Sequence, residues 1–220
     1  MDYRFLAEII ALKPQLFRAI LNFNRKYAAP LPEELASLGR PFTGLWSKPA
    51  FRRAWPVPSS SSPGYWNFYE ESRRLALLDA DTVARLGLYF SAAVHAEELA
   101  QVIARDQVLE LRRVLGANVT AYALKRGRYQ VAAMRHLLAV PASFGPLPRR
   151  IGIAVAPALI EEGWPEELRA LAGIRRPASD GREEEMFRPQ LRREQRTALW
   201  FIMKKLLLRE VAPEWAPCFD

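Results

Sequence analysis

Few side chains in this sequence could carry out chemistry, and they stand far apart. The donors that suit transition metals are two histidines, His95 and His136, and one cysteine, Cys218. No pair of them has the spacing that lets ligands converge on one ion. A Ser or Cys nucleophile needs a base and an orienting acid, and neither a GxSxG nor a glycine-rich phosphate-binding motif occurs. The sequence therefore predicts no catalytic residue, no cofactor site and no metal site. An enzyme with an unfamiliar site is the alternative that a deep polar pocket would favour.

Acidic residues occur in adjacent groups, which could suggest paired carboxylates for acid–base catalysis. Neighbouring side chains on a helix point about 100° apart, so such a pair does not form a facing dyad. We interpret these groups as solvated turns at helix ends, where charge interacts with the helix dipole. We expect structural roles for His95, at a predicted helix end, and for His136. The acidic groups are Glu97-Glu98, Glu161-Glu162, Glu166-Glu167 and Glu183-Glu184-Glu185.

Arginines beside aromatic residues give the clearest binding signal. Arg52 and Arg53 lie between Phe51 and Trp55, a combination that could pair phosphates and stack a base. The same residue types also anchor protein–protein interfaces. The last predicted helix adds a basic face. The candidate partner-binding residues are Trp46, Arg52, Arg53, Trp55, Arg192, Arg193 and Arg196.

Nucleic-acid binding is the alternative to protein binding. The net charge of +8 is divided: residues 1–58 carry nine Lys or Arg against four Asp or Glu, and residues 188–220 carry seven against four. Such basic ends could meet nucleic acid, acidic lipid or an acidic protein, or could be an ordinary solvated surface. No helix-turn-helix, RNP-type or zinc-finger pattern occurs. We therefore expect a protein rather than a nucleic acid as the partner.

The composition favours a folded protein of a reducing compartment. Half of the 220 residues are hydrophobic, which is enough for a substantial core. The single cysteine excludes an internal disulfide. The first residues lack the basic start of a secretory leader, and no apolar run reaches the roughly 18 residues of a membrane span. We expect a cytoplasmic protein without membrane insertion.

Helices are predicted for all of the elements that must position these residues. Residues 81–127 contain no proline, and their apolar residues recur at steps of three and four, the period of one helical face. Asp81 is predicted to cap the first helix. Further helical runs follow over 99–103, 106–115 and 118–127, and Gly116 and Gly127 are predicted to end two of them. Small residues such as Gly87 and Ala93 would let neighbouring helices approach closely.

The remaining segments also lack strand alternation. Residues 2–28 read as amphipathic helices with Pro14 in a first turn, and residues 29–64 as a Pro/Ser-rich irregular segment that packs on the helical core. Further helices are predicted over 67–78, 129–140, 151–160 with a bend at Pro157, and 189–211. The sequence thus predicts an all-α fold with one globular domain over residues 1–220, about eight helices, and residues 81–127 at its centre.

The central stretch resembles the SctK family of bacterial type III secretion systems, which includes YscK, PscK, OrgA and MxiK. That family shows a Leu-Gly pair, a small-residue/His-Ala step, a helix with Ile or Val, a second Leu-Gly pair and a Tyr-x-Leu segment. The resemblance covers about a fifth of the chain and consists of packing residues. The matching places here are Leu86-Gly87, His95-Ala96, Val102-Ile103, Leu115-Gly116 and Tyr122-Ala123-Leu124.

The resemblance implies a non-catalytic adaptor of the secretion sorting platform. Proteins like SctK lie beneath the inner-membrane ring on its cytosolic side. They connect the cytoplasmic domain of the ring protein SctD to the SctQ pods, which lead through SctL to the SctN ATPase. We therefore expect a scaffold peripheral to the inner-membrane apparatus. SctD-like and SctQ-like proteins would be its direct partners, and SctL and the ATPase its indirect ones.

Overall fold

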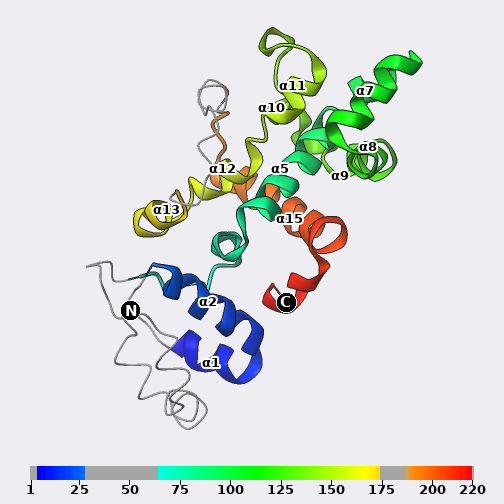
Figure 1. The fold of residues 1–220 in the computed structure, drawn as a ribbon. Coiled ribbons are helices and arrows are strands. Elements are labelled where there is room, and N and C mark those ends of the chain that lie inside the picture. The colour runs from blue at the N-terminus through cyan, green and yellow to red at the C-terminus, as the bar shows by residue number, and fades with distance from the viewer. Residues whose placement is uncertain (1–3, 28–63, 174–186, 188, 220) are drawn as a thin grey trace. The chain divides into compact units, whose positions relative to one another are not determined.

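The computed structural model describes residues 4–27, 64–173, 187 and 189–219. All regular structure in these ranges is helical, and no strand occurs in them (Figure 1). This confirms the all-α prediction. The Pro/Ser-rich segment 29–64 lies outside the described residues except for Gly64, so its packing stays a prediction.

Twelve α-helices lie in the described ranges, several of them only one or two turns long. They are α1 (Arg4–Leu12), α2 (Pro14–Lys26), α5 (Ala80–Val94), α6 (Ala96–Gln101), α7 (Arg105–Leu115), α8 (Ala117–Tyr122), α9 (Arg128–Gln130), α10 (Arg135–Leu138), α11 (Leu147–Gly152), α12 (Ala156–Glu161), α13 (Glu166–Gly173) and α15 (Arg193–Leu206). The 3₁₀ segments are η2 (Glu71–Leu77), η4 (Ala132–Met134), η5 (Ala142–Phe144) and η7 (Pro213–Cys218). The π-helical segments are η3 (Ala123–Gly127) and η6 (Leu207–Val211).

The chain divides into two compact units. Unit 1 comprises Met1–Leu78, Pro165–Arg175 and Glu214–Asp220, and unit 2 comprises Asp79–Trp164 and Arg176–Pro213. The expectation of one domain over residues 1–220 stays a prediction. Each unit is described by itself below.

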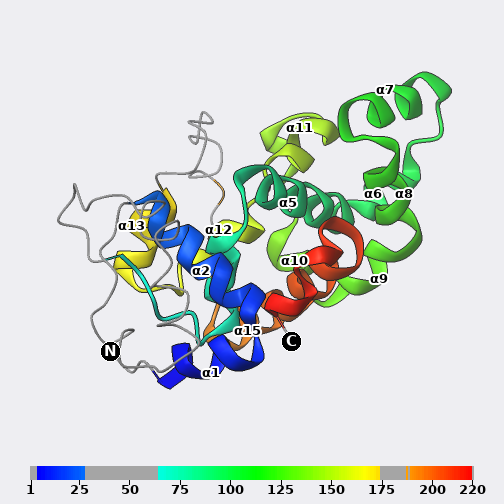
Figure 2. The same ribbon diagram turned by 60° about the horizontal axis from the view of Figure 1, so that its bottom comes forward.

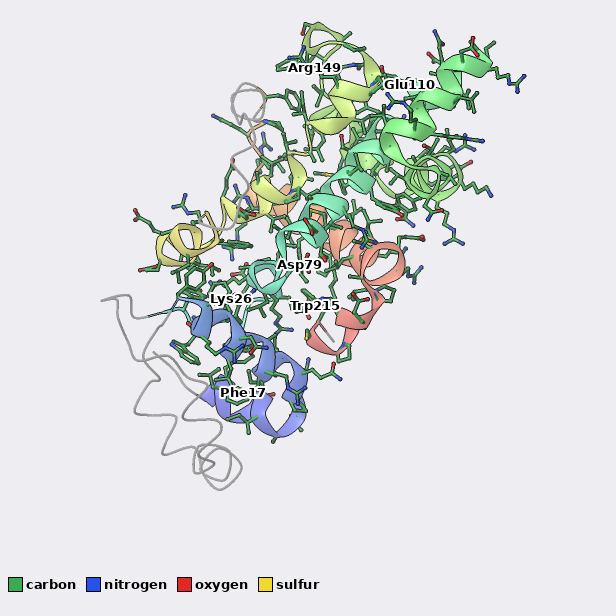
Figure 3. All side chains as sticks on the ribbon, viewed as in Figure 1. Phe17, Lys26, Asp79, Glu110, Arg149 and Trp215 are labelled. Carbon is green, nitrogen blue, oxygen red and sulfur yellow. The ribbon has the colours of Figure 1, made fainter. Side chains whose placement is uncertain are left out.

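Helix α5 is the element around which unit 2 is built. It packs against α8, α11, α12 and α15 of the same unit (Figure 2), and Leu86 and Phe90 on it are buried as predicted. Its N-cap is Asp79, so the prediction of Asp81 is wrong. The Asp79 carboxylate accepts the Thr82 N–H at 2.8 Å (Figure 3 labels Asp79), and Asp79 has the extended backbone that an N-cap requires.

Two glycines of unit 2 allow helices to come into contact without intervening side chains. A Cβ atom at Gly127 would lie 2.6 Å from the Ala93 Cβ, and one at Gly87 would lie 2.8 Å from the Ala154 Cβ. Both distances are shorter than van der Waals contact, so only glycine fits. The predicted approach of helices through small residues is therefore confirmed at Gly127 and Ala93. Gly87 meets Ala154 in the segment between α11 and α12, whereas Ala100 and Ala104 are exposed.

The predicted helix ends differ in outcome. Gly116 has φ +89° and follows the last residue of α7, as predicted. Gly127 has φ −57° and does not end a helix, because the chain continues through η3 into α9. The predicted helical run over 99–103 is wrong in part: Leu99 is buried in α6, but α6 ends at Gln101 and the Ile103 side chain is 89% exposed.

Three predicted long helices are divided. Residues 151–160 belong to α11 and α12, because Pro157 lies in the first turn of α12, where its missing N–H has no intrahelical partner to lose. Residues 129–140 form α9, η4 and α10. The predicted helix 189–211 begins as α15 only at Arg193 and becomes π-helical at Leu207.

The described residues of unit 1 contain three α-helices, α1, α2 and α13, and several irregular segments. Helices α1 and α2 pack against each other, and Pro14 begins α2 as predicted. Phe23 of α2 meets the ring of Phe68 edge to face, with 5.4 Å between centroids. The predicted helix 67–78 is a 3₁₀ helix over Glu71–Leu77.

Two buried polar side chains join these irregular segments to the helices. The Asn24 side chain accepts the Tyr65 N–H and donates to the Tyr65 carbonyl, both at 2.8 Å. The Arg74 guanidinium donates to the carbonyls of Phe68, Tyr69 and Cys218 at 3.1, 3.3 and 2.8 Å. The last contact brings the segment after unit 2 back onto unit 1, where Phe219 is fully buried.

Candidate interaction site

The described part of the predicted binding surface is the start of α15. The helix begins because the Gln195 side chain accepts the Arg192 N–H at 2.8 Å and the Arg192 carbonyl accepts the Arg196 N–H at 2.9 Å. Arg192, Arg193 and Arg196 therefore lie within one turn of one another. The other candidates, Trp46, Arg52, Arg53 and Trp55, lie outside the described residues.

Arg192 and Arg193 are exposed, and neither forms an ion pair with a described residue. Positive charge at the N-terminal end of a helix opposes the helix dipole. Glu194 offsets it only in part, being a single acid in the first turn. Helix stability therefore does not account for the two arginines, which leaves their guanidinium groups available to an external carboxylate or phosphate.

Arg196 has a different environment. Its side chain is half-buried, its Nη2 lies 3.9 Å from the Glu162 carboxylate, and its Cδ lies against Gly163. It therefore joins α15 to the end of α12 inside unit 2. Of the three predicted arginines, Arg192 and Arg193 are exposed to solvent, whereas Arg196 packs inside unit 2.

The most tightly bonded polar cluster in unit 2 is formed by His95, Glu98 and Arg150. The buried His95 ring lies between α5 and α6; its Nδ1 is 2.8 Å from the Glu98 carboxylate, and its Nε2 accepts the Val140 N–H at 3.2 Å. Arg150 forms an ion pair with the same Glu98 carboxylate and donates to the Val140 carbonyl at 3.1 Å. The cluster thus links α6, α11 and the segment after α10.

The electrostatics of this cluster favour a structural role. Burial lowers the pKa of His95, and the Arg150 hydrogen bond lowers the pKa of Glu98. Both ring nitrogens of His95 are engaged, so neither is open to a metal or a substrate. The predicted structural role of His95 fits this geometry. Nε2 accepts the Val140 N–H and burial lowers the pKa of the ring, and both favour the neutral imidazole.

Other groups considered for chemistry are also engaged or isolated. Glu97 and Glu98 are not merely solvated, because they form ion pairs with Arg135 and Arg150. Cys218 is buried, and burial raises the pKa of its thiol, which disfavours the reactive thiolate. In the described ranges no three His, Cys, Asp or Glu side chains are placed to hold a metal ion. None of the described helices combines the length and apolarity needed to cross a bilayer.

Sequence reasoning missed a second basic region in unit 2. Arg126 of η3 forms an ion pair with Glu210 of η6 at 2.7 Å, although the two residues are 84 positions apart. Arg85 of α5 donates to the carbonyl of Val211 in the same segment at 3.0 Å. No local pattern signals either contact, because both depend on how α5, η3 and η6 pack together.

The chain matches no family model, no curated protein and no solved structure. The candidate site therefore stands on its own geometry and on the residue pattern of the central helices.

Proposed function

We propose that the protein is a non-catalytic adaptor of a bacterial type III secretion sorting platform, which links an SctD-like ring protein to SctQ-like pods at the cytosolic side of the inner membrane. The observation that carries the proposal is the ordered resemblance over residues 86–124. Most of its members are packing residues of unit 2: Leu86, His95, Ala96, Leu115, Tyr122 and Ala123 are all buried.

The glycines of the resemblance also have structural reasons. Gly87 is required by the close approach of Ala154, and Gly116 by its positive φ at the end of α7. One pair fits less well, because Ile103 is exposed and lies between helices. The pattern therefore supports a shared helical body, whose outer side chains would bind the partners.

The exposed charges support the adaptor role in this proposal. Arg192 and Arg193 are exposed at the start of α15, where their positive charge opposes the helix dipole rather than stabilising the helix. A scaffold needs such side chains on a stiff body, because a preorganised surface loses little conformational entropy on binding.

Co-purification from the native host tests the proposal. An affinity-tagged chain should retain SctD-like and SctQ-like proteins. The double substitution Arg192→Glu, Arg193→Glu should reduce the recovery of at least one of them about tenfold. Arg105→Glu, Arg112→Glu on α7 is the matched control, because it reverses two exposed charges of the same unit.

Recovery of neither partner with the unaltered chain would refute the adaptor proposal. Retardation of DNA or RNA at physiological ionic strength, with a steep salt dependence, would favour nucleic-acid binding instead.

A further inference from the structure

The two π-helical segments of unit 2 meet at one basic surface. Arg126 of η3 reaches Glu210 of η6, and Arg85 of α5 binds the Val211 carbonyl, so two elements, η3 and α5, converge on η6. Around this junction Lys125 and Arg126 are exposed on one helix, and Lys205 and Arg209 on the other. We define the junction surface as Arg85 and Arg126, which contact η6, the neighbouring Lys125, and the exposed side chains Phe201, Lys205 and Arg209 of α15 and η6.

The junction surface has an excess of positive charge. Its described members include five cations, whereas the acid between them, Glu210, is already paired with Arg126. Neither Lys205 nor Arg209 forms an ion pair with a described residue. Cations held close together repel one another, and an approaching carboxylate relieves that repulsion.

An apolar anchor lies in line with the cations of α15 and η6. Phe201, Lys205 and Arg209 follow at steps of four, which places them along one side of the helix. The Phe201 side chain is 62% exposed, although an aromatic ring gains most of its interaction energy when it is buried against a partner. The row therefore presents one apolar contact followed by two cationic contacts.

We infer that the junction surface docks an acidic, amphipathic helix of a partner protein, with an aliphatic side chain against Phe201 and carboxylates against Lys205 and Arg209. A helix is the fitting occupant because its side chains repeat at the same steps of three and four. The inference deepens the adaptor proposal and rests on it only in taking the partner to be a protein.

The geometry favours an acidic protein over a nucleic acid. The other exposed aromatic residue nearby on the sequence is Tyr129, three positions after Arg126. The Arg128 guanidinium lies over the Tyr129 ring at 4.5 Å and also bonds its hydroxyl. One face of the Tyr129 ring is therefore covered by Arg128, which leaves Phe201 as the exposed ring of the junction surface. Binding of single strands uses several open aromatic faces, on which successive bases stack.

Selection from a random peptide library tests the inference with the full chain as bait. Selected 16-residue peptides should be rich in Asp and Glu and should carry aliphatic residues at helical spacing. In fluorescence anisotropy with one such peptide, Lys205→Glu, Arg209→Glu should weaken binding about tenfold or more, and Phe201→Ser about fivefold. Arg105→Glu, Arg112→Glu changes the net charge equally and should alter binding less than about twofold.

The circular dichroism spectrum of each variant should match that of the unaltered chain. If Lys205→Glu, Arg209→Glu unfolds the protein, Lys205→Gln, Arg209→Gln replaces it in the binding measurement. Peptides without acidic enrichment, or acidic peptides whose binding ignores the Lys205 and Arg209 substitutions, would overturn the inference. So would a 20-nucleotide single strand that binds more tightly than the peptides and loses binding in the same variant. The two tests are independent. Failure of co-purification would refute the adaptor proposal but not the docking of an acidic helix, and failure of the peptide experiment would refute the docking but not the adaptor proposal.

Discussion

The contacts that stabilise unit 1 internally differ in kind from those that stabilise unit 2 internally. In unit 2, α5 touches its neighbours through glycine and alanine, with Gly127 against Ala93 and Gly87 against Ala154. In unit 1, the irregular segments around Tyr65 and Cys218 are held by side chains that bond their backbone, namely Asn24 and Arg74.

The difference follows from where backbone hydrogen bonds are made. A helix satisfies its own N–H and C=O groups, so joining two helices requires only complementary shape. An extended or 3₁₀ segment leaves some of these groups without a partner, and burying them alone is costly. Unit 1 therefore relies on polar side chains to hold its irregular segments. Unit 2 joins α5 to its neighbours through small residues, and its buried polar side chains, His95 and Arg150, likewise bond an irregular segment, at Val140.

The largest effect is expected from removing the Arg74 guanidinium. Arg74→Ala leaves the carbonyls of Phe68, Tyr69 and Cys218 without their donor and should lower the free energy of unfolding by about 3 kcal/mol. Hydrogen exchange should increase over residues 64–78 and 213–219. Arg25→Ala, an exposed arginine of the same unit, is the control and should change little.

If Arg74→Ala raised exchange in α5 as much as in unit 1, the two units would unfold as one, and the contrast drawn between them would lose its energetic meaning. If amide protection from exchange were kept in unit 2 and lost only in unit 1, this variant would show that the two units unfold separately.

A smaller effect is expected from adding one methyl group at the closest helix contact. Gly127→Ala places a Cβ 2.6 Å from that of Ala93 and should destabilise unit 2 by about 2 kcal/mol in urea unfolding. Gly152→Ala is the matched control, because nothing lies within 4 Å of a Cβ there. It should cost nothing and could add up to about 1 kcal/mol through helix propensity. Equal stability of the two variants would contradict close approach as the organising contact of unit 2.

The smallest effect is expected from pH. Burial lowers the pKa of His95 below its usual 6.5, so the unfolded chain binds a proton that the folded chain resists. Stability is therefore complete above about pH 6.5 and declines as the pH falls below that value. The unfolding free energy of the unaltered chain should fall between pH 7.5 and 5.5, whereas that of His95→Gln should stay nearly flat over this interval.

Below this range both proteins should lose further stability, because the pKa values of Glu98 and Asp79 are also lowered in the fold. A profile for His95→Gln that is as steep as that of the unaltered chain between pH 7.5 and 5.5 would show that another group titrates there.

The helical class and the small-residue contacts of the centre could be predicted from the sequence. Periodicity identifies buried positions such as Leu86 and Phe90, and the glycines among them indicate close approach. The N-cap was misplaced by two residues because Asp79 and Asp81 are equally suitable as residue types, and only the backbone at Asp79 is extended.

Contacts between distant segments could not be predicted in this way. Asn24 reads as a polar residue in an amphipathic helix, and nothing near it in the sequence points to Tyr65. Likewise Arg126 and Glu210 meet only because η3 and η6 both pack on α5. The predicted basic face of the last helix is therefore divided in the structure: Arg196 lies beside Glu162, while Lys205 and Arg209 are exposed.

Unit 1 is assembled from three separate stretches of the chain, and both stretches of unit 2 lie between them in the sequence. During synthesis the ribosome delivers α1 and α2 first, yet the carbonyl that Arg74 binds, at Cys218, lies 144 residues after Arg74. The first stretch of unit 1 therefore lacks the contact with Cys218 until the whole of unit 2 has been synthesised. Attaching a bulky fusion directly after the buried Phe219 would obstruct this final closing step, whereas the helices around α5 could already have formed.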